Sequence, residues 1–375
     1  MSKNITEIPY TEMVERGMSI ARVNPNAIER FRGLLQDIYT RDIPMKHDWQ
    51  FLFVSSAITT TAEFKTGNAS ATTDSAIVTF SSDATITSDM VGRKIKFSGN
   101  DVVYKVDSFI SAQSIQILPP LNGATNLTSV SYSIFQPIYA LASNFDRFPK
   151  GGGLYRWSGN EKEILPEEPY QEYTENYSGS LSIPEKVILV GMDTAGNPLL
   201  ELRPAPKDAR VYSYDYLKRL PPMMETTANL LRGVSAQTTA VSFIGTTQFT
   251  EVNTDSATIN YFRVDVLGKG QDSQWYPVLG YTGNSALTLR SVFANSAITS
   301  SANYTIAEIP KMPSMLHTAI LYGAVAETMM DQGDEKAAIF YAKYAQVLSD
   351  AKRIYVTRVY VQDIHGIQEE WDYRR

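Results

Sequence analysis

The sequence contains no cysteine among its 375 residues. Without thiols the chain cannot form a disulfide framework, a thiolate metal site or a cysteine nucleophile. Histidine is scarce as well, since only His47, His317 and His365 are present and they lie far apart. None of them belongs to a His-Glu-x-x-His or comparable metal-binding spacing. The sequence therefore predicts no metal site.

Long apolar runs and a surplus of positive charge are also missing. No segment is apolar for long enough to predict a membrane span. The opening MSKNITEIPYTEM has neither a basic start nor an apolar core, so we expect no secretory signal. Lys and Arg number 34 against 40 Asp and Glu, which gives a net charge of −6. Because nucleic-acid-binding proteins usually carry a basic surplus, binding of nucleic acid is not predicted as the main task.

Motifs of catalysis are not apparent. The sequence has no G-x-S-x-G nucleophile elbow. The glycine run in KGGGLYRW is not followed by the Gly-Lys-Ser/Thr of a phosphate-binding loop, and it predicts a turn instead. The adjacent pairs Glu167-Glu168 and Glu369-Glu370 are typical of solvated surface. We therefore predict that the protein is not an enzyme and needs no cofactor. A glycan hydrolase with two carboxylates across a cleft stays open as an alternative.

Helical patterns are concentrated at the two ends of the chain. Asn24 is a capping residue and Pro25 follows at the first helical position, a pairing that favours helix initiation. Near the C-terminus, two apolar stripes separated by Gln332-Gly333 predict a helical hairpin, whose many small residues allow close packing. The residues expected to pack in these helices are Ile28, Phe31, Leu35, Ile38, Trp49, Leu316, Ile320, Gly323, Tyr341, Tyr344 and Leu348.

Between the helices lie two segments rich in Ser, Thr, Ala and Asn, with short strand-like runs separated by turn residues. Aligned without gaps, they repeat the same apolar positions, which predicts a duplicated β module. A looser match pairs Ala76 with Ala240 and MVGRKIKF with INYFRVDV. The gap-free pairs are Tyr104 with Tyr276, Ile115 with Leu287, Ile117 with Leu289, Leu121 with Phe293, Tyr132 with Tyr304, and Ile134 with Ile306.

These patterns predict an α+β protein in which the N- and C-terminal helices form a helical bundle hub, with two small all-β modules, sandwich-like or barrel-like, inserted into it. The predicted divisions are an N-terminal helical part of the hub (1–54), the first β module (55–139), an extended or β part of the hub (140–232), the second β module (233–309), the C-terminal hairpin (310–353) and a C-terminal arm (354–375).

The order of four stretches resembles the head-to-tail adaptor (connector or neck) proteins of tailed bacteriophages. The stretches are AIERFRGLLQDIYTRD followed by HDWQFLF, then GNPLLELRPAPKDARVYSYDYLKRLPPM, then the C-terminal hairpin, together with inserted β modules such as SDMVGRKIKFSGNDVVYKVDS. The chain departs from short adaptors by its two large insertions. What the resemblance implies is a virion protein made in the host cytoplasm and located at the neck.

The resemblance also implies the assembly and its partners. Such proteins form a ring, commonly of about twelve subunits, between the portal protein and the tail or next neck protein, and DNA passes through without sequence-specific binding. A mildly acidic channel would repel DNA phosphates. The C-terminal arm commonly engages the portal, while the residues alone leave open a fraying tail. The arm residues expected to dock are Arg353, Tyr355, Arg358, Tyr360, Ile364 and Trp371.

The main alternative is a virion receptor-binding, glycan-binding or decoration protein that acts through its β modules. The 22 tyrosines suit such surfaces, because tyrosine offers a large contact area at a low entropic cost. A ring, a trimer and a monomeric enzyme differ in their number of subunits, so the mass of the purified protein separates these hypotheses.

Overall fold

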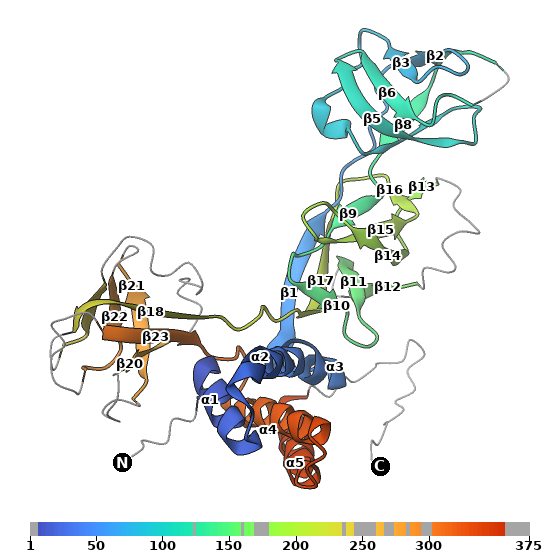
Figure 1. The fold of residues 1–375 in the computed structure, drawn as a ribbon. Helices are drawn as coiled ribbons and strands as arrows, with labels where there is room; N and C mark the ends of the chain where they lie inside the picture. The colour runs from blue at the N-terminus through green and yellow to red at the C-terminus, as the bar shows by residue number, and fades with distance from the viewer. Residues whose placement is uncertain are drawn as a thin grey trace. The chain divides into compact units, whose positions relative to one another are not determined.

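The structure is a computed structural model that describes residues 7–122, 125–158, 161–168, 180–234, 238–243, 260–265, 274–282, 286–293 and 302–356. These residues form two compact units (Figure 1). One unit contains the chain up to Phe51 together with the described residues from Leu220 onward, and the other contains Leu52 to Arg219. Each unit contains hydrophobic core clusters of its own.

The predicted helical bundle hub is wrong. Strands make up 39% of the chain and form several separate sheets, so the protein is mostly β and belongs to the α+β class only loosely. The segment 140–232 is the main reason, because it was assigned to the hub as an extended part. It instead supplies most strands of the middle sheets, which enclose a hydrophobic core of their own.

The helices of the described chain lie near its two ends. Helix α4 packs against α1, α2 and α5, and its buried residues lie on all sides of it. Helix α5 packs against α4 along one side only. The helical elements are α1 (Tyr10–Ala21), η1 (Pro25–Ala27), α2 (Ile28–Asp37), η2 (Ile38–Asp42), α3 (Ile43–Lys46), η3 (Gln50–Leu52), η4 (Ser88–Met90), α4 (Ser314–Asp331) and α5 (Ala337–Tyr355).

Helices α2 and α3 are joined by a turn of π-helix, η2. The N–H of Ile43 donates to the carbonyl of Ile38, five residues earlier. Pro44 follows and has no N–H to donate to the carbonyl of Thr40, so the α-helical pattern cannot continue unchanged there. The wider turn lets the chain bend toward the buried Trp49, whose Nε1–H donates to the carbonyl of Ile43 at 2.7 Å.

Two glycines allow the helices to approach closely. A Cβ on Gly17 of α1 would lie 2.1 Å from the Phe31 ring of α2, and a Cβ on Gly323 of α4 would lie 2.9 Å from Ile38. Neither contact is compatible with a side chain unless the neighbouring residue moves. The small residues are therefore required by the packing of α1, α2 and α4.

The middle sheets lie in the unit that contains Leu52 to Arg219. Strand β17 pairs with β1 on one side and with β10 and β11 on the other, and β12 follows β11; a second sheet has the order β14-β15-β9. The strands are β1 (Phe53–Thr59), β9 (Ile138–Ala140), β10 (Phe145–Arg147), β11 (Gly153–Ser158), β12 (Glu161–Pro166), β13 (Leu181–Ser182), β14 (Lys186–Met192), β15 (Pro198–Arg203), β16 (Ala205–Pro206) and β17 (Val211–Lys218).

The first β module is a seven-stranded sheet with the order β7-β2-β3-β6-β5-β4-β8. Its two outermost strands, β7 and β8, are consecutive in the chain and are separated only by Ser131. They act as one interrupted strand that pairs with β2 at one end and with β4 at the other. The strands are β2 (Ala69–Ala71), β3 (Ile77–Phe80), β4 (Lys94–Phe97), β5 (Val103–Ser111), β6 (Ser114–Leu118), β7 (Leu127–Val130) and β8 (Tyr132–Phe135).

The second β module is a closed barrel with the order β18-β19-β22-β21-β20-β23. Here β23 is uninterrupted and pairs with both β18 and β20, which closes the barrel. All twelve residues of the six gap-free sequence pairs lie in the two cores. The strands are β18 (Glu225–Val234), β19 (Ala240–Phe243), β20 (Asn260–Asp265), β21 (Tyr276–Tyr281), β22 (Ala286–Leu289) and β23 (Ala302–Glu308).

The looser part of the alignment has the wrong register. Ile95 lies opposite Tyr104 and Ile134, and in the barrel Phe262 lies opposite the matching Tyr276 and Ile306. The structure therefore equates Ile95 with Phe262, whereas the looser match placed it on Val264, two residues away.

The match of Ala76 with Ala240 is displaced by one residue. Val78 faces Ile115 in the first module, and Val241 faces the matching Leu287 in the second. Ile77 therefore corresponds to Ala240. Turns of different length between the strands account for both shifts.

Candidate functional site

Most residues predicted to pack the helices are buried. Ile28 is only half-buried, and Tyr341 is 55% exposed because α5 turns this position away from α4. The fully buried members of the set are Phe31, Leu35, Ile38, Trp49, Leu316, Ile320, Gly323, Tyr344 and Leu348.

Only two of the predicted docking residues of the arm belong to the described chain. Arg353 is exposed on the last turn of α5. Tyr355 ends that helix, and its ring meets the Phe51 ring edge-on at 6.4 Å. The next residue, Val356, forms an isolated β-bridge with Trp49. Arg358, Tyr360, Ile364 and Trp371 lie outside the described residues.

Helix α5 is held in place by a buried phenol. The Tyr344 hydroxyl donates to the carboxylate of Asp42, and the ammonium group of Lys46 lies 5.5 Å from the Tyr344 ring centre. Burial raises the pKa of Tyr344, and the bond to the Asp42 carboxylate raises it further. The phenol therefore remains protonated and keeps donating over the physiological range.

The outer face of α5 has no helix packed on it among the described elements. A stripe of small, exposed residues runs along this face: Ala338, Ala342, Ala345 and Ser349. Their spacing of three and four residues places them on one side of the helix. Tyr341 borders the stripe. We call these five residues the α5 outer stripe.

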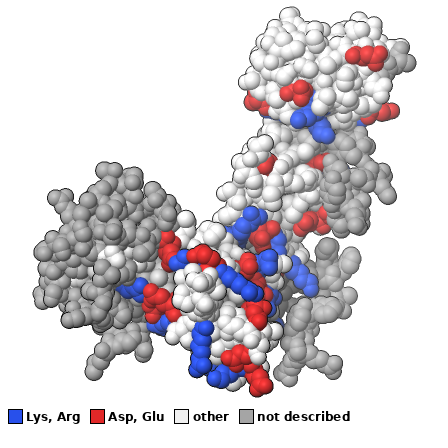
Figure 2. Space-filling view, viewed as in Figure 1, with Lys and Arg blue, Asp and Glu red and all other residues white. Residues whose placement is uncertain are grey.

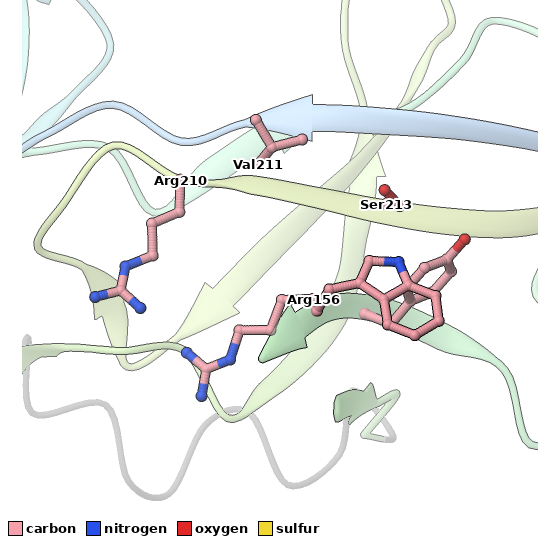
Figure 3. Close-up of a pocket in the computed structure, with 6 residues that line it drawn as sticks. Arg156, Arg210, Val211 and Ser213 are labelled. Atoms are coloured by element: carbon pink, nitrogen blue, oxygen red, sulfur yellow. The ribbon is translucent and has the colours of Figure 1, made fainter. Parts of the chain in front are cut away.

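A shallow notch of about 380 Å³ lies where β11 and β17 separate (Figure 3). The two strands pair only at Leu154 with Tyr214 and at Tyr155 with Ser213. The notch is lined by aromatic, basic and small side chains and by no carboxylate or histidine, so it offers no acid–base pair for hydrolysis. The lining residues are Tyr155, Arg156, Trp157, Arg210, Val211 and Ser213.

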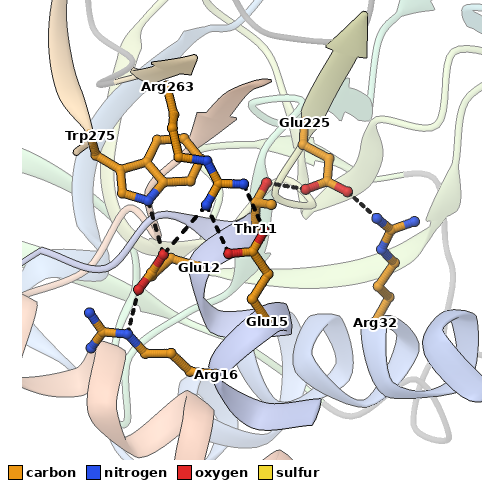
Figure 4. A network of polar contacts seen from close by, with 8 residues as sticks. All are labelled: Thr11, Glu12, Glu15, Arg16, Arg32, Glu225, Arg263 and Trp275. Carbon is orange, nitrogen blue, oxygen red and sulfur yellow. Dashed lines mark hydrogen bonds and ion pairs between the residues drawn. The ribbon is translucent and has the colours of Figure 1, made fainter. Parts of the chain in front are cut away.

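A polar network joins the barrel to α1 (Figure 4). Arg263 of β20 donates to both carboxylate oxygens of Glu15, at 2.8 and 2.7 Å. The Arg263 guanidinium also lies 4.6 Å from the centre of the Trp275 ring, and the Trp275 Nε1–H donates to Glu12 at 3.0 Å. Glu12 in turn accepts from Arg16, one turn further along α1, at 2.6 Å. We call Glu12, Glu15, Arg263 and Trp275 the barrel clamp.

A second set of contacts lies next to the clamp at the start of the barrel. Glu225 accepts from Thr11 of α1 and from Arg32 of α2 (Figure 4). Tyr261 of β20 donates to Glu7 at 2.5 Å. Beneath these polar groups Tyr261 and Trp275 belong to a small apolar cluster with Ala307 and Ile309. The barrel therefore contacts the helices through an apolar patch rimmed by charged pairs.

Charged side chains are mixed in sign over the helices. On the face drawn in Figure 2, Lys and Arg lie among Asp and Glu across this part of the molecule. On the described part of this face, the interspersed charges form no single-sign field.

The described residues include neither a cluster of metal-binding side chains nor a membrane-spanning helix. That part of the chain has no group of three or more His, Asp or Glu side chains placed to hold a metal ion. Nor does any of its helices combine the length and the apolar character needed to cross a bilayer.

No protein-family model matches the sequence, and no curated protein matches it either.

Proposed function

We propose that the chain is a structural subunit of the head-to-tail adaptor of a tailed bacteriophage. Copies assemble side by side into a ring between the portal and the tail, and DNA passes through the ring without sequence-specific contacts. The observation that carries the proposal is the α5 outer stripe. A long terminal helix that leaves small and aromatic side chains bare is suited to packing against another subunit.

The size of the residues in the stripe supports a helix-to-helix contact. Helices approach to about 8 Å when the residues between them are small. Ala338, Ala342, Ala345 and Ser349 form a strip of small, exposed side chains along about three turns. Tyr341 at its border is one of the residue types most enriched at interface hot spots. Ile339 and Ile354 are also exposed on α5, at 56% each, but they lie on other sides of the helix than the stripe.

The charge balance supports passage of DNA through the ring. The chain has a net charge of −6, and a ring multiplies that charge by its number of subunits. A ring with a net negative charge repels phosphates and so favours passage of the duplex over tight binding. The proposed contact with the portal is assigned to the C-terminal arm, 354–375, whose first two residues are the last two of α5.

The experiment compares two arginine substitutions that are adjacent in the chain but lie on different sides of α5. Ala345→Arg places a long cation in the outer stripe, and Gln346→Arg places the same side chain about 100° around the helix. Both positions are exposed, so neither change disturbs the core. We expect wild-type protein and Gln346→Arg to form rings, alone or after mixing with the portal, and Ala345→Arg to remain a monomer.

Light scattering gives the mass of each sample and negative-stain images give its shape. If Ala345→Arg formed rings as well as the wild type does, α5 would not be part of the interface between subunits. A wild-type trimer, or a monomer that ignores the portal, would contradict the adaptor proposal and favour the receptor-binding or glycan-binding alternative.

The portal contact has a separate test. Deleting 357–375 removes the distal arm but leaves α5 complete. We expect the shortened protein to fold and to lose co-sedimentation with the portal. Full retention of portal binding would place the portal contact elsewhere on the subunit.

A further inference from the structure

Strand β1 stands at one end of the sheet β1-β17-β11-β12, and no described strand pairs with it on the side away from β17 (Figure 1). The N–H of Thr60, directly after β1, donates to the carbonyl of Arg210 at 2.8 Å and continues the register of β1 with β17. Because hydrogen bonds point alternately to the two sides of an antiparallel strand, the backbone groups of Ser55, Ala57 and Thr59 point away from β17. In the described part of the chain, no hydrogen bond to these backbone groups is formed.

The free edge of β1 has none of the features by which natural proteins prevent strands from pairing with an edge. Exposed edges normally carry charged residues, proline or a bulge, or they are very short. Strand β1 reads FVSSAIT, seven residues without a charge or a proline, and its pairing with β17 has no bulge. The opposite edge strand of the same sheet, β12, contains Glu161, Lys162, Glu163 and Pro166. The edge of β1 is therefore open to another strand, whereas that of β12 is protected.

The two faces beside the free edge differ in polarity. Ile58 belongs to the hydrophobic core of the middle sheets, and Val54, which packs against that core, is only partly buried. Ser55, Ala57 and Thr59 are exposed on the opposite face. A strand that extends the sheet at β1 should therefore place apolar residues on the side of Val54 and polar ones on the other side.

The chain itself contains a segment with this pattern, directly after its last helix. Helix α5 ends at Tyr355, and Val356 follows in an extended conformation, with φ −90° and ψ 122°. The sequence continues as TRVYVQ (357–362), which is rich in β-branched and aromatic residues. The C-terminal arm therefore begins in the extended conformation that an added strand requires.

The register of Val356 separates the arm from the β1 strand of its own chain. Val356 forms an antiparallel bridge with Trp49. Continuing an antiparallel pairing matches later arm residues with positions before Trp49, whereas β1 begins after it, at Phe53. The arm therefore cannot reach its own β1 by continuing this pairing. The β1 strand of a neighbouring copy has no such restriction.

We propose that residues 357–362 of one subunit pair, as an added strand, with the free edge of β1 in a neighbouring subunit of the ring. The inference rests on the ring of the proposed function, and it adds a contact between subunits to that of the α5 outer stripe. The unpaired backbone groups of Ser55, Ala57 and Thr59 supply the main-chain hydrogen bonds that hold such a strand. Residues 363–375 remain available for the portal.

The arm fits the edge of β1 in length and in alternation. Its six-residue stretch TRVYVQ nearly matches the seven residues of β1. Val359 and Val361 extend the core side beyond Val54, where an apolar cross-strand neighbour is favourable. Arg358 and Tyr360 then stand on the exposed face, because side chains alternate along a strand.

The absence of cysteine provides a clean background for disulfide trapping in the full-length protein. One variant carries Ala57→Cys, and a second carries Arg358→Cys, Val359→Cys or Tyr360→Cys. The two are mixed, so that a mixed disulfide joins two copies, and mass spectrometry of unreduced digests identifies it. We expect Ala57→Cys to link to Arg358→Cys or Tyr360→Cys, and at least about tenfold less to Val359→Cys. Residues that share a face lie within disulfide distance, whereas the residue between them points away.

Ile164→Cys is the matched control, because Ile164 is exposed on the same face of the sheet as Ala57 but on the protected edge strand. It should form no mixed disulfide with any arm variant. Linking of Val359→Cys as strongly as its neighbours would overturn the proposal, and so would linking of Ile164→Cys as strongly as Ala57→Cys. A disulfide found only within single copies of the double variant, Ala57→Cys with Tyr360→Cys, would place the arm on its own subunit and overturn it too.

Light scattering on the same mixtures separates this inference from the proposed function. Rings that yield no mixed disulfide would overturn the added strand and leave the adaptor proposal intact. A sample without rings, alone or with the portal, would contradict the adaptor proposal and this inference together.

Discussion

Strands β4 and β20 occupy the same place in the two β modules, with Ile95 and Phe262 buried in their respective cores. Their outward residues differ. The module with β20 presents Tyr261, which donates to Glu7 just before α1, and Arg263, which donates to Glu15 of α1. The corresponding residues of β4 are Lys94 and Lys96. Val103 precedes the matched Tyr104, and Trp275 precedes the matched Tyr276, so Val103 corresponds to Trp275 of the barrel. Because side chains alternate along a strand, the residues that point inward maintain the shared fold. The residues that point outward determine what the module contacts.

Truncating a matched core residue should have the largest effect, because it should destabilise only the module that carries the change. Phe262→Ala is expected to destabilise the barrel by about 3–5 kcal/mol, and Ile95→Ala the first module by about 2–5 kcal/mol, because each leaves a cavity in a closely packed core. Hydrogen exchange measured by mass spectrometry should show faster exchange only in the module that carries the change. Thr79→Ala, at an exposed position, serves as the control and should change stability by less than about 0.5 kcal/mol. Equal loss of protection in both modules would contradict their independence.

A change at the matched outward positions should have a smaller and more local effect. Arg263→Ala removes the two hydrogen bonds to Glu15 and the stack on Trp275. Because Glu15 is half exposed, we expect the clamp to weaken by only about 1 kcal/mol, and less at high salt. Hydrogen exchange in α1 reports this loss.

Lys96→Ala is the matched change in the first module, where Val103 offers no indole for a cation to stack on. It should leave exchange in α1 unaltered. If the two variants changed α1 equally, the clamp would not be what distinguishes the modules.

Alkaline pH should affect the two modules alike. Burial raises the pKa of both Tyr132 and Tyr304 from 10.0 to about 12, with the charge of Asp83 as a second cause at Tyr132. A phenol with a raised pKa contributes stability that is complete below pH 10 and is lost as the pH rises toward 12. Tyr132→Phe and Tyr304→Phe should each reduce this loss in its own module. The difference in tyrosinate absorbance between the wild type and each Phe variant reports ionisation of that one tyrosine, and circular dichroism reports unfolding. Ionisation of either tyrosine near pH 10 without unfolding would contradict the burial argument.

The matched core positions of the two modules were predictable because their strongest signals are local. Tyr104 and Ile115 lie in adjacent strands of one hairpin, and Tyr132 and Ile134 alternate within a single strand. Neither pattern depends on the rest of the chain. The register of β4 against β20 was not predictable, because a shift of two residues preserves the inward and outward alternation.

The fold class was wrong for a different physical reason. The alternation of Tyr212, Tyr214 and Tyr216 predicts one strand face, and all three side chains are buried. It does not predict which strand lies alongside, and β17 pairs with β1, which is far away in sequence. When the pairing with β1 is unknown, nothing in the alternation shows that the segment 140–232 forms a core of its own. The segment was therefore assigned to the helical hub.

The candidate surfaces were predicted only in part. Helical periodicity identifies α5, but a helix with so many alanines has no clear apolar side, so Tyr341 was assigned inward although it is exposed. The free edge of β1 was missed because it depends on the order of the strands in the sheet. That order becomes visible only in three dimensions.

The ends of each β module lie side by side. Glu225 at the start of the barrel pairs with Ala307 near its end. In the first module, Thr61 donates to Gln136 at 3.1 Å, just outside the strands. A segment that leaves and returns at one point can be gained or lost as a whole while the path of the surrounding chain is preserved. Either module can therefore be exchanged as a unit, and its outward residues can change while its core is retained.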